Sequence, residues 1–295
     1  NYIQHQIASG RFQAGDRIVE TQLARELNVS QAPVREAILE LAAMGLLEER
    51  PYSGSFVRKL TAEDVEDIYN TRAFLDEYAA RYPDRIRRVK HEGRFGNARD
   101  HFFWLMKECG ASYMMFCDQD DVWHPDKVEK TMRALLEAED EAGRDTPVLV
   151  FTDLTPVDEN LRPIASSLMR MQRQYAVTID YRALLFQNIV TGCATGINRT
   201  LAGLASRCTD TSQVIMHDWW LGVVAARFGK IVYLDESTML YRQHGGNSVG
   251  AKDVGGIRYL LHSLHHAAAI RMGLLAKKRQ ATIFSVLYQD SLSQP

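Results

Sequence analysis

Several features are scarce or absent in this sequence, and each absence excludes a class of protein. The 295 residues include only four cysteines (Cys109, Cys117, Cys193 and Cys208), with no CxxC pair and no metal-ligand spacing. This excludes a disulfide scaffold, suits a reducing compartment and favours buried, inert thiols. No apolar run reaches the roughly 18 residues of a membrane-spanning helix, and the first residues show no secretory signal. The cytoplasm is therefore the expected location.

The sequence also has no large excess of either charge. It contains 35 Lys and Arg residues and 37 Asp and Glu residues, for a net charge of −2. A near-neutral chain has no overall attraction to nucleic acid or to a membrane, so any DNA binding must come from a local patch. The hydrophobic fraction of 46% and the charged fraction of 24% are typical of soluble globular chains. The length predicts one large domain or two smaller ones.

Residues 1–60 predict two helices joined by a tight turn and followed by a hairpin. Thr21 and Ser30 are candidate N-caps, each ahead of apolar residues at helical spacing. Segments 46–50 and 55–58 alternate around Pro51-Tyr52-Ser53-Gly54, which indicates a two-stranded hairpin. This order is the plan of a winged helix-turn-helix domain.

A change of pattern is predicted near Pro83. Residues 61–81 favour a connecting helix, which Pro83 should end. Beyond it, short apolar runs at 113–117, 148–152 and 231–234 alternate with helical stretches at 126–141 and 218–228. Such alternation indicates an α/β domain with a mostly parallel sheet covered on both faces. We therefore expect a winged helix domain at 1–60, a connecting helix at 61–82 and an α/β domain at 83–295.

The second helix of the first domain carries residues suited to DNA contact. Polar residues at its start lie where exposed backbone N–H groups attract phosphate, and Arg35, one turn in, can donate two hydrogen bonds to a guanine edge. Gly54 at the hairpin tip permits close approach to a minor groove. A small winged helix used for protein contact remains the alternative.

The stretch 27–37, with 15–18, 54–57 and 60–64, resembles the GntR family of bacterial transcription regulators, of the FadR type, over residues 1–81. The resemblance implies binding of duplex DNA, with the helical bundle of the FadR-type effector domain absent after its first helix. The residues that it assigns to DNA are Thr21, Ser30, Gln31, Ala32, Arg35 and Gly54.

In the second domain, an apolar strand at 113–117 is followed by Asp118, Asp120 and Asp121. Ligands of open α/β sheets bind at the carboxyl ends of strands, and clustered carboxylates suit Mg²⁺ or Mn²⁺ that bridges a diphosphate. A solvated acidic loop is the alternative. Asp218 opens a helix, where it is either a general base or a simple helix cap.

Further polar and small residues surround these carboxylates in the sequence. The loop 241–248 offers Arg242 and His244 to phosphate. The segment 191–194 has small side chains around Gly192, either for close approach of a substrate or for tight packing.

The motifs at 117–123, 152–154, 192–193, 217–221 and 241–244 together resemble family 2 glycosyltransferases, nearest to the rhamnosyltransferase-like proteins, over residues 83–260. The resemblance implies an incomplete GT-A-like (Rossmann-like) mixed sheet and inverting, metal-dependent sugar transfer from a UDP- or dTDP-linked donor to a glycan or lipid-linked acceptor. The latter also allows peripheral membrane contact. In this scheme Asp218 is the catalytic base, and Asp118, Asp120, Arg242 and His244 bind the metal and diphosphate. The sugar contacts are Trp123, Asp153, Gly192 and Trp219, with buried packing as the alternative for the tryptophans.

The first β-α-β segment of that family, which holds the base and ribose, is missing from the sequence. We therefore expect the strand at 113–117 to be central but to lack one neighbour. Three functions remain open: a transferase with an N-terminal DNA-binding module, a transcription regulator with an inert C-terminal body, and a composite with neither activity.

Overall fold

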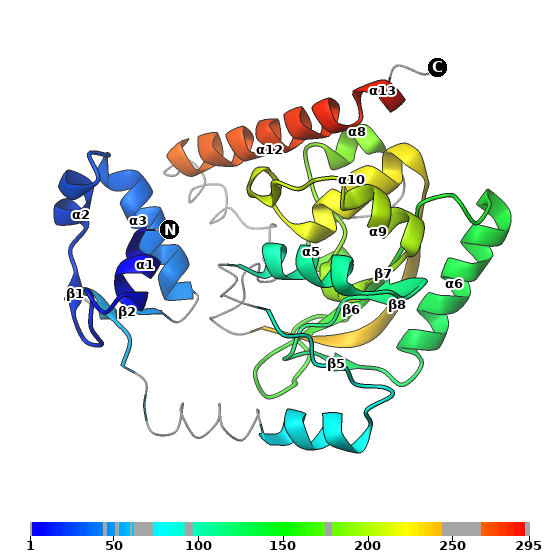
Figure 1. Cartoon of the computed structure of the whole chain (residues 1–295), viewed down its shortest axis with the longest axis horizontal. Helices are drawn as coiled ribbons and strands as arrows, with labels where there is room; N and C mark the ends of the chain where they lie inside the picture. The colour runs from blue at the N-terminus through cyan, green and yellow to red at the C-terminus, as the bar shows by residue number, and fades with distance from the viewer. Residues whose placement is uncertain are drawn as a thin grey trace. The chain divides into compact units, whose positions relative to one another are not determined.

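The computed structural model describes residues 2–43, 46–50, 53–59, 61, 73–91, 97–174, 179–243 and 267–292. They divide into two compact units, the first within Asn1–Arg94 and the second within Phe95–His244 and Gly250–Pro295. Figure 1 shows the elements of both units. Each unit has its own hydrophobic core, so each is described separately.

The described residues up to Lys59 combine the helices α1, α2 and α3 with a small antiparallel sheet in which β3 pairs with both β1 and β2. Its core is formed by apolar side chains that recur at helical spacing on the second and third helices, such as Leu23, Val34, Ile38 and Leu41. The predicted winged helix-turn-helix is confirmed, with β1 as an additional strand. The elements are α1 (Tyr2–Ala8), β1 (Arg17–Ile18), α2 (Glu20–Glu26), α3 (Gln31–Ala43), β2 (Leu47–Arg50) and β3 (Gly54–Val57).

The predicted N-cap at Thr21 is wrong. α2 begins one residue earlier, at Glu20, because the extended backbone of Val19 already places the helix start there. Thr21 therefore lies inside the first turn. α3 begins at Gln31, directly after Ser30. Residues 73–81 are helical, in agreement with the end of the predicted connecting helix, whereas residues 62–72 lie outside the described residues.

The second unit is built around one five-stranded sheet and a set of helices. The strands are β4 (Tyr113–Met115), β5 (Val122–Trp123), β6 (Val148–Val157), β7 (Thr195–Asn198) and β8 (Lys230–Arg242). The helices are α5 (Ala98–Glu108), α6 (Lys127–Ala142), α7 (Leu168–Met171), α8 (Tyr181–Leu184), η1 (Gly192–Ala194), α9 (Arg199–Ala205), η2 (Thr211–Gln213), α10 (His217–Phe228), α12 (Ala267–Leu287) and α13 (Gln289–Leu292).

The sheet confirms the mixed α/β fold but corrects two expectations. Its strand order is β4-β7-β6-β8-β5, so β4 is an edge strand rather than a central one. Within the described part of the chain, no strand pairs with the outer side of β4, where the expected neighbour is missing. Only β6 and β8 pair in parallel, and the other three pairs are antiparallel, so the sheet is not mostly parallel. Apolar runs show that strands are buried but do not fix their direction.

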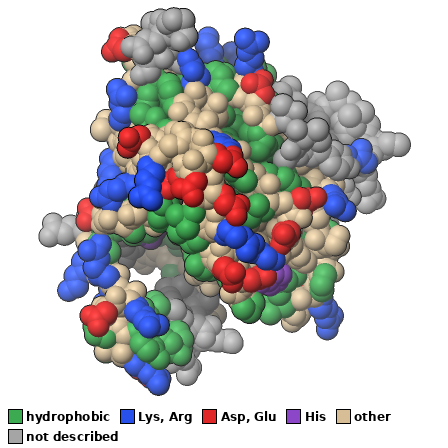
Figure 2. Space-filling model, turned by 90° about the vertical axis from the view of Figure 1, so that its right-hand side faces the viewer, with side chains coloured by type: hydrophobic (Ala, Val, Ile, Leu, Met, Phe, Trp, Pro, Cys, Tyr) green, Lys and Arg blue, Asp and Glu red, His purple; other side chains and the backbone are tan. Residues whose placement is uncertain are grey.

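A large apolar cluster of the second unit lies between the sheet and the helices α5, α9, α10 and α12, and a smaller one lies between the sheet and α6. All but one of the β6 side chains are buried, because the strand is central and covered on both faces. On the face drawn in Figure 2, acidic and basic side chains are intermixed. The expectation of buried thiols is confirmed for Cys193 and Cys208, whereas Cys109 is half-buried and Cys117 is exposed on the loop after β4.

Gly229 is a sensitive packing position, because a Cβ atom there would lie 1.8 Å from the carbonyl oxygen of Pro147. That carbonyl accepts the first hydrogen bond of β8, from Lys230. We expect Gly229→Ala to lower the free energy of unfolding by about 3 kcal/mol, since the two backbones must separate. Urea unfolding followed by tryptophan fluorescence measures this unit alone, because every tryptophan belongs to it: Trp104, Trp123, Trp219 and Trp220.

Gly203 supplies the matched control for this substitution. It lies in α9, and a Cβ atom there would meet no atom within 4 Å. Gly203→Ala should leave stability unchanged or raise it by about 0.5–1 kcal/mol, because alanine favours helix. Equal stability of the two variants would contradict the packing argument.

Candidate functional site

The acidic loop between β4 and β5 meets the short helix η1. Asp118 and Asp121 of the loop and Cys193 of η1 each offer one ligand atom, and these three atoms lie within 4.8 Å of one another. We call these three residues the carboxylate cluster. Asp120 is outside this set, and its main-chain carbonyl accepts a hydrogen bond from the Arg242 side chain at 2.9 Å. The structure thus places Asp121, rather than Asp120, closest to Asp118 and the thiol.

The electrostatics of the carboxylate cluster favour an additional positive charge. Burial, with the nearby charges of Asp121 and Asp120, raises the pKa of Asp118 to about 6. Burial also raises the pKa of Asp121 and of the Cys193 thiol. Each shift reflects the cost of holding negative charge in a partly dry place beside other acids. A bound cation would remove that cost.

One orphaned atom tests whether a metal ion fits the carboxylate cluster. Asp121 Oδ1 accepts a hydrogen bond from the Arg242 backbone N–H at 3.1 Å, whereas its Oδ2 is buried without a partner. A buried carboxylate oxygen without a partner is costly, and a divalent cation would satisfy it. The two carboxylates fit a divalent ion that prefers oxygen ligands, such as Mg²⁺ or Mn²⁺.

Lys127, which the sequence analysis missed, is a buried cation beside this cluster. It is 1% exposed, and its ammonium donates to Thr238 Oγ1 at 3.3 Å and lies 5.0 Å from the centre of the Trp123 ring. Burial lowers the pKa of Lys127, while Cys193, Cys117 and Asp121 oppose that shift. Helical spacing could have found it, since Lys127 shares a buried face with Thr131 and Leu135.

Asp218 is held in the first turn of α10 by two backbone hydrogen bonds. Its Oδ1 accepts from the Trp219 N–H at 2.6 Å and its Oδ2 from the Gly192 N–H at 3.1 Å. Burial nevertheless raises its pKa to about 6, and the charge of Asp118 contributes. At neutral pH such a carboxylate is ionised yet readily takes a proton, as a general base must. The structure provides no side-chain cap at this helix start, so Asp218 is not its N-cap.

The helix η1 connects the two acidic positions. The backbone N–H of Gly192 donates a hydrogen bond to Asp218, and the next residue, Cys193, belongs to the carboxylate cluster. A Cβ atom on Gly192 would lie 2.7 Å from His217 Nε2. Glycine is therefore required here by tight packing, one of the two alternatives predicted for this segment.

His217 is buried between aromatic rings with neither ring nitrogen bonded. Its ring lies 4.3 Å from Phe102 and 5.2 Å from Phe116, centre to centre, and both nitrogens lack a hydrogen-bond partner. Burial lowers its pKa to about 3, so the imidazole is neutral. This unsatisfied side chain next to Asp218 was not anticipated.

Three other predicted sugar contacts are buried or half-buried, and one of them, Trp123, packs against the apolar cluster that contains Cys193. Trp219 is 8% exposed and its indole N–H donates to the carbonyl of Leu184. Asp153 is buried and accepts from the backbone N–H groups of Leu154 and Met169. Trp123 is half-buried in β5.

Arg242, predicted in a loop, is instead the last residue of β8, and its guanidinium donates to backbone carbonyls of Asp120 and Glu159. His244 lies outside the described residues.

In the first unit, the predicted DNA contacts gather around the start of α3. Ser30, Gln31 and Ala32 are exposed there, and Thr21 is exposed on α2. Gly54 begins β3 with φ of 96°, a backbone conformation that favours glycine. An exposed helix start and a glycine at the wing are suited to contact with a duplex.

Arg35 is the best-placed cation on this surface, and Glu20 holds it in position. Its Nε donates to Glu20 Oε1 at 2.5 Å and its Nη2 to Oε2 at 2.9 Å. The Arg35 side chain is 63% exposed, so the guanidinium remains accessible while its plane is fixed. Fixing an arginine before binding lowers the entropy cost of contact with a base.

The comparisons with known proteins agree with both predicted resemblances. Residues 1–57 match the gntR family of bacterial regulatory proteins, and residues 65–200 match glycosyl transferase family 2. The second match begins before the predicted junction at residue 83. The chain is therefore similar to the gntR family in its first unit and to glycosyl transferase family 2 in its second, and both predicted resemblances are confirmed.

Individual relatives divide in the same way. The chain is 42% identical over 79 residues to the uncharacterized HTH-type transcriptional regulator YdhC of Bacillus subtilis, covering 27% of this chain and 35% of that protein. Identity to the Nta operon transcriptional regulator of Aminobacter aminovorans is 42% over 73 residues, covering 25% of this chain and 35% of that protein. Identity to the dTDP-rhamnosyl transferase RfbG of Shigella flexneri is 27% over 194 residues, covering 62% of this chain and 61% of that protein. The chain thus spans about a third of each regulator and less than two thirds of the transferase.

The neutral, unbonded His217 predicts a specific dependence of stability on pH. The unfolded chain takes up a proton below pH of about 6.5, whereas the folded imidazole does so only near pH 3. The His217 contribution to stability should therefore fall by roughly 1.4 kcal/mol per pH unit as the pH drops through this window. Asp118 and Asp218, whose pKa values are raised, gain protons in the folded state below pH 6 and oppose the loss.

A comparison with His217→Leu isolates the histidine contribution, because the carboxylates remain. The variant should gain more stability than the wild type as the pH falls from 6 to 4, by about 1.4 kcal/mol per pH unit, measured by urea denaturation at fixed pH values. At pH 7 it should be at least as stable as the wild type, because two unsatisfied nitrogens are removed. If the free energy of unfolding depended on pH in the same way in the variant and the wild type, His217 would not contribute to that dependence.

Proposed function

We propose that the second unit is a metal-dependent, inverting glycosyltransferase module that acts on a nucleotide-diphosphate sugar, joined to a DNA-binding module. The domains would be a winged helix at 1–60, a connecting helix at 61–82 and the transferase body at 83–295. The observation that carries this proposal is the link through η1. Gly192 donates its backbone N–H to Asp218, and the adjacent Cys193 is part of the carboxylate cluster. One rigid turn thus sets the base candidate relative to the metal candidates.

Each residue has a definite role in this proposal. Asp118, Asp121 and Cys193 would hold Mn²⁺ or Mg²⁺, with the predicted ligand Asp120 beside them, and the ion would stabilise the diphosphate leaving group. Asp218 takes the proton of the acceptor hydroxyl while that oxygen attacks the anomeric carbon and the nucleoside diphosphate departs. Arg242 and His244 would contact the diphosphate.

The substrates follow from the family and its relatives. A UDP- or dTDP-linked sugar would be the donor, with rhamnose favoured by the similarity to RfbG. A glycan or a lipid-linked sugar would be the acceptor. Because the family's first β-α-β segment is missing beside β4, we expect weak donor binding and slow transfer.

Substitution in the carboxylate cluster tests the metal site. Asp121→Asn should weaken Mn²⁺-dependent binding of UDP or dTDP at least tenfold, since a neutral amide replaces a charged ligand (about 1.4 kcal/mol or more). Calorimetry with and without Mn²⁺ measures this, and binding should weaken as the pH falls below 6, where Asp118 becomes protonated. Asp218→Asn should retain binding but abolish transfer.

Asp140→Asn, on the far end of α6, is the matched control for loss of one carboxylate and should bind as the wild type does. If the wild type shows no Mn²⁺-dependent nucleotide binding, the enzyme proposal fails. The second candidate, a transcription regulator with an inert C-terminal body, would then be favoured by the exposed Arg35 and the start of α3.

The DNA-binding proposal has its own test. Arg35→Ala should weaken binding to a specific duplex by about 1–3 kcal/mol if the guanidinium contacts guanine. Fluorescence anisotropy with labelled duplexes at two salt concentrations measures the loss and separates it from non-specific binding. Arg133→Ala, an exposed arginine on α6 of the other unit, should bind as the wild type does. Unchanged affinity of Arg35→Ala on every duplex would remove Arg35 from the interface.

A further inference from the structure

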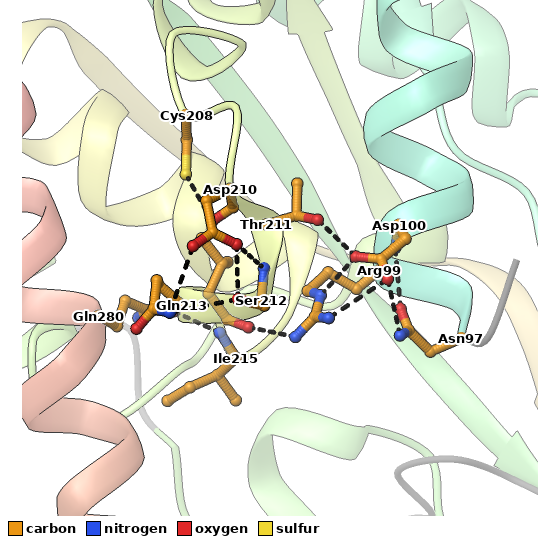
Figure 3. A network of polar contacts seen from close by, with 11 residues as sticks. Asn97, Arg99, Asp100, Cys208, Asp210, Thr211, Ser212, Gln213, Ile215 and Gln280 are labelled. Atoms are coloured by element: carbon orange, nitrogen blue, oxygen red, sulfur yellow. Dashed lines mark hydrogen bonds and ion pairs between the residues drawn. The ribbon is translucent and has the colours of Figure 1, made fainter. Parts of the chain in front are cut away.

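The helix α12 carries a surface that neither proposed activity uses. Its last turns are anchored to the rest of the second unit by the buried Gln280 and Phe284, and the buried Tyr288 directly follows the helix. Gln280 accepts a hydrogen bond from the Ile215 N–H at 2.9 Å, and Tyr288 donates to the carbonyl of Leu204. Figure 3 shows Gln280 beside the polar network around η2.

The earlier turns of α12 present both apolar and basic side chains to solvent. Met272, Leu274 and Leu275 are 48%, 57% and 39% exposed. Arg271, Lys278 and Arg279 are also exposed. None of these three cations forms an ion pair with another of the described residues. We call these six residues the outward face of α12, the long orange-to-red helix of Figure 1.

The charge of this helix is of one sign. The sequence 267–287 contains Arg271, Lys277, Lys278 and Arg279 and no acidic residue, although the whole chain has a net charge of −2. Lys277 turns inward, 5.9 Å from the centre of the Trp219 ring. A local basic surface interleaved with exposed leucine and methionine is thus set on a nearly neutral molecule.

We propose that the outward face of α12 docks on an anionic lipid surface. Cations there would approach lipid phosphates, while Met272, Leu274 and Leu275 enter the boundary between headgroups and acyl chains. None of the helices among the described residues is long and apolar enough to cross a membrane, so the contact is with the surface.

The chemistry of this surface favours lipid over other partners. A duplex would use the cations but would leave three large apolar side chains against phosphate and water. A second copy of the chain would place like charges together. Anionic lipid offers phosphates to the cations of the outward face and acyl chains to its apolar side chains. This argument does not depend on the transferase proposal.

Vesicle flotation with the full chain tests the proposal. Binding should be strong to vesicles of phosphatidylcholine mixed with phosphatidylglycerol and weak to phosphatidylcholine alone. Arg271→Gln/Lys278→Gln/Arg279→Gln should reduce the partition coefficient on the order of 100-fold, at about fivefold for each cation. Leu274→Ser/Leu275→Ser should reduce it by about tenfold or more while retaining the charge.

The matched control is Arg133→Gln/Arg162→Gln/Arg182→Gln, which removes three exposed cations elsewhere on the same unit and should leave vesicle binding unchanged. Because all substituted residues are exposed, thermal unfolding should be the same for every variant. Equal losses in control and test variants, equal binding to both vesicle types, or no vesicle binding would overturn the proposal. It would also be overturned if the α12 cation substitutions weakened duplex DNA binding and spared vesicles.

Discussion

The parallel pairing of β6 with β8 is the constraint on which the second unit depends. The two strands pair from Val148 and Lys230 to Val157 and Arg242, with register shifts near Asp153. β7 adds to the other side of β6, and β5 adds to β8. Because β5 directly follows the acidic loop and pairs with β8, with Val122 opposite Leu240, the pairing of β5 with β8 brings Arg242 to Asp120 and Asp121. The site is thus a consequence of where the long strands end.

The chemistry of the site rests on charge that the fold holds partly out of water. Asp118 and Asp218 have raised pKa values, and Lys127 is a buried cation with a lowered one. Groups with perturbed pKa values that converge from separate elements are typical of functional sites. The unsatisfied atoms of Asp121 and His217 are costs that a packed core would avoid. Their concentration around η1 distinguishes this region from the rest of the unit.

The open side of β4 limits what the module can do. As an edge strand it has backbone groups that no strand among the described residues pairs, a known route to association between chains. The missing β-α-β segment is also the part of the family that holds the base and ribose. We therefore expect an incomplete donor pocket beside the metal and base candidates, whereas the first unit has a core of its own.

The sequence by itself determined the kinds of element and the acidic motifs. Helical spacing around Leu23 and Ile38 and the turn at Gly54 were enough to predict the winged helix, because these signals are local. The tertiary structure decided the edge position of β4, the partnership of Asp118 with Asp121 and Cys193, and the burial of Lys127 and His217. Those features depend on contacts between residues far apart in the chain, and the pattern of a single segment carries no information about which distant segment will pack against it.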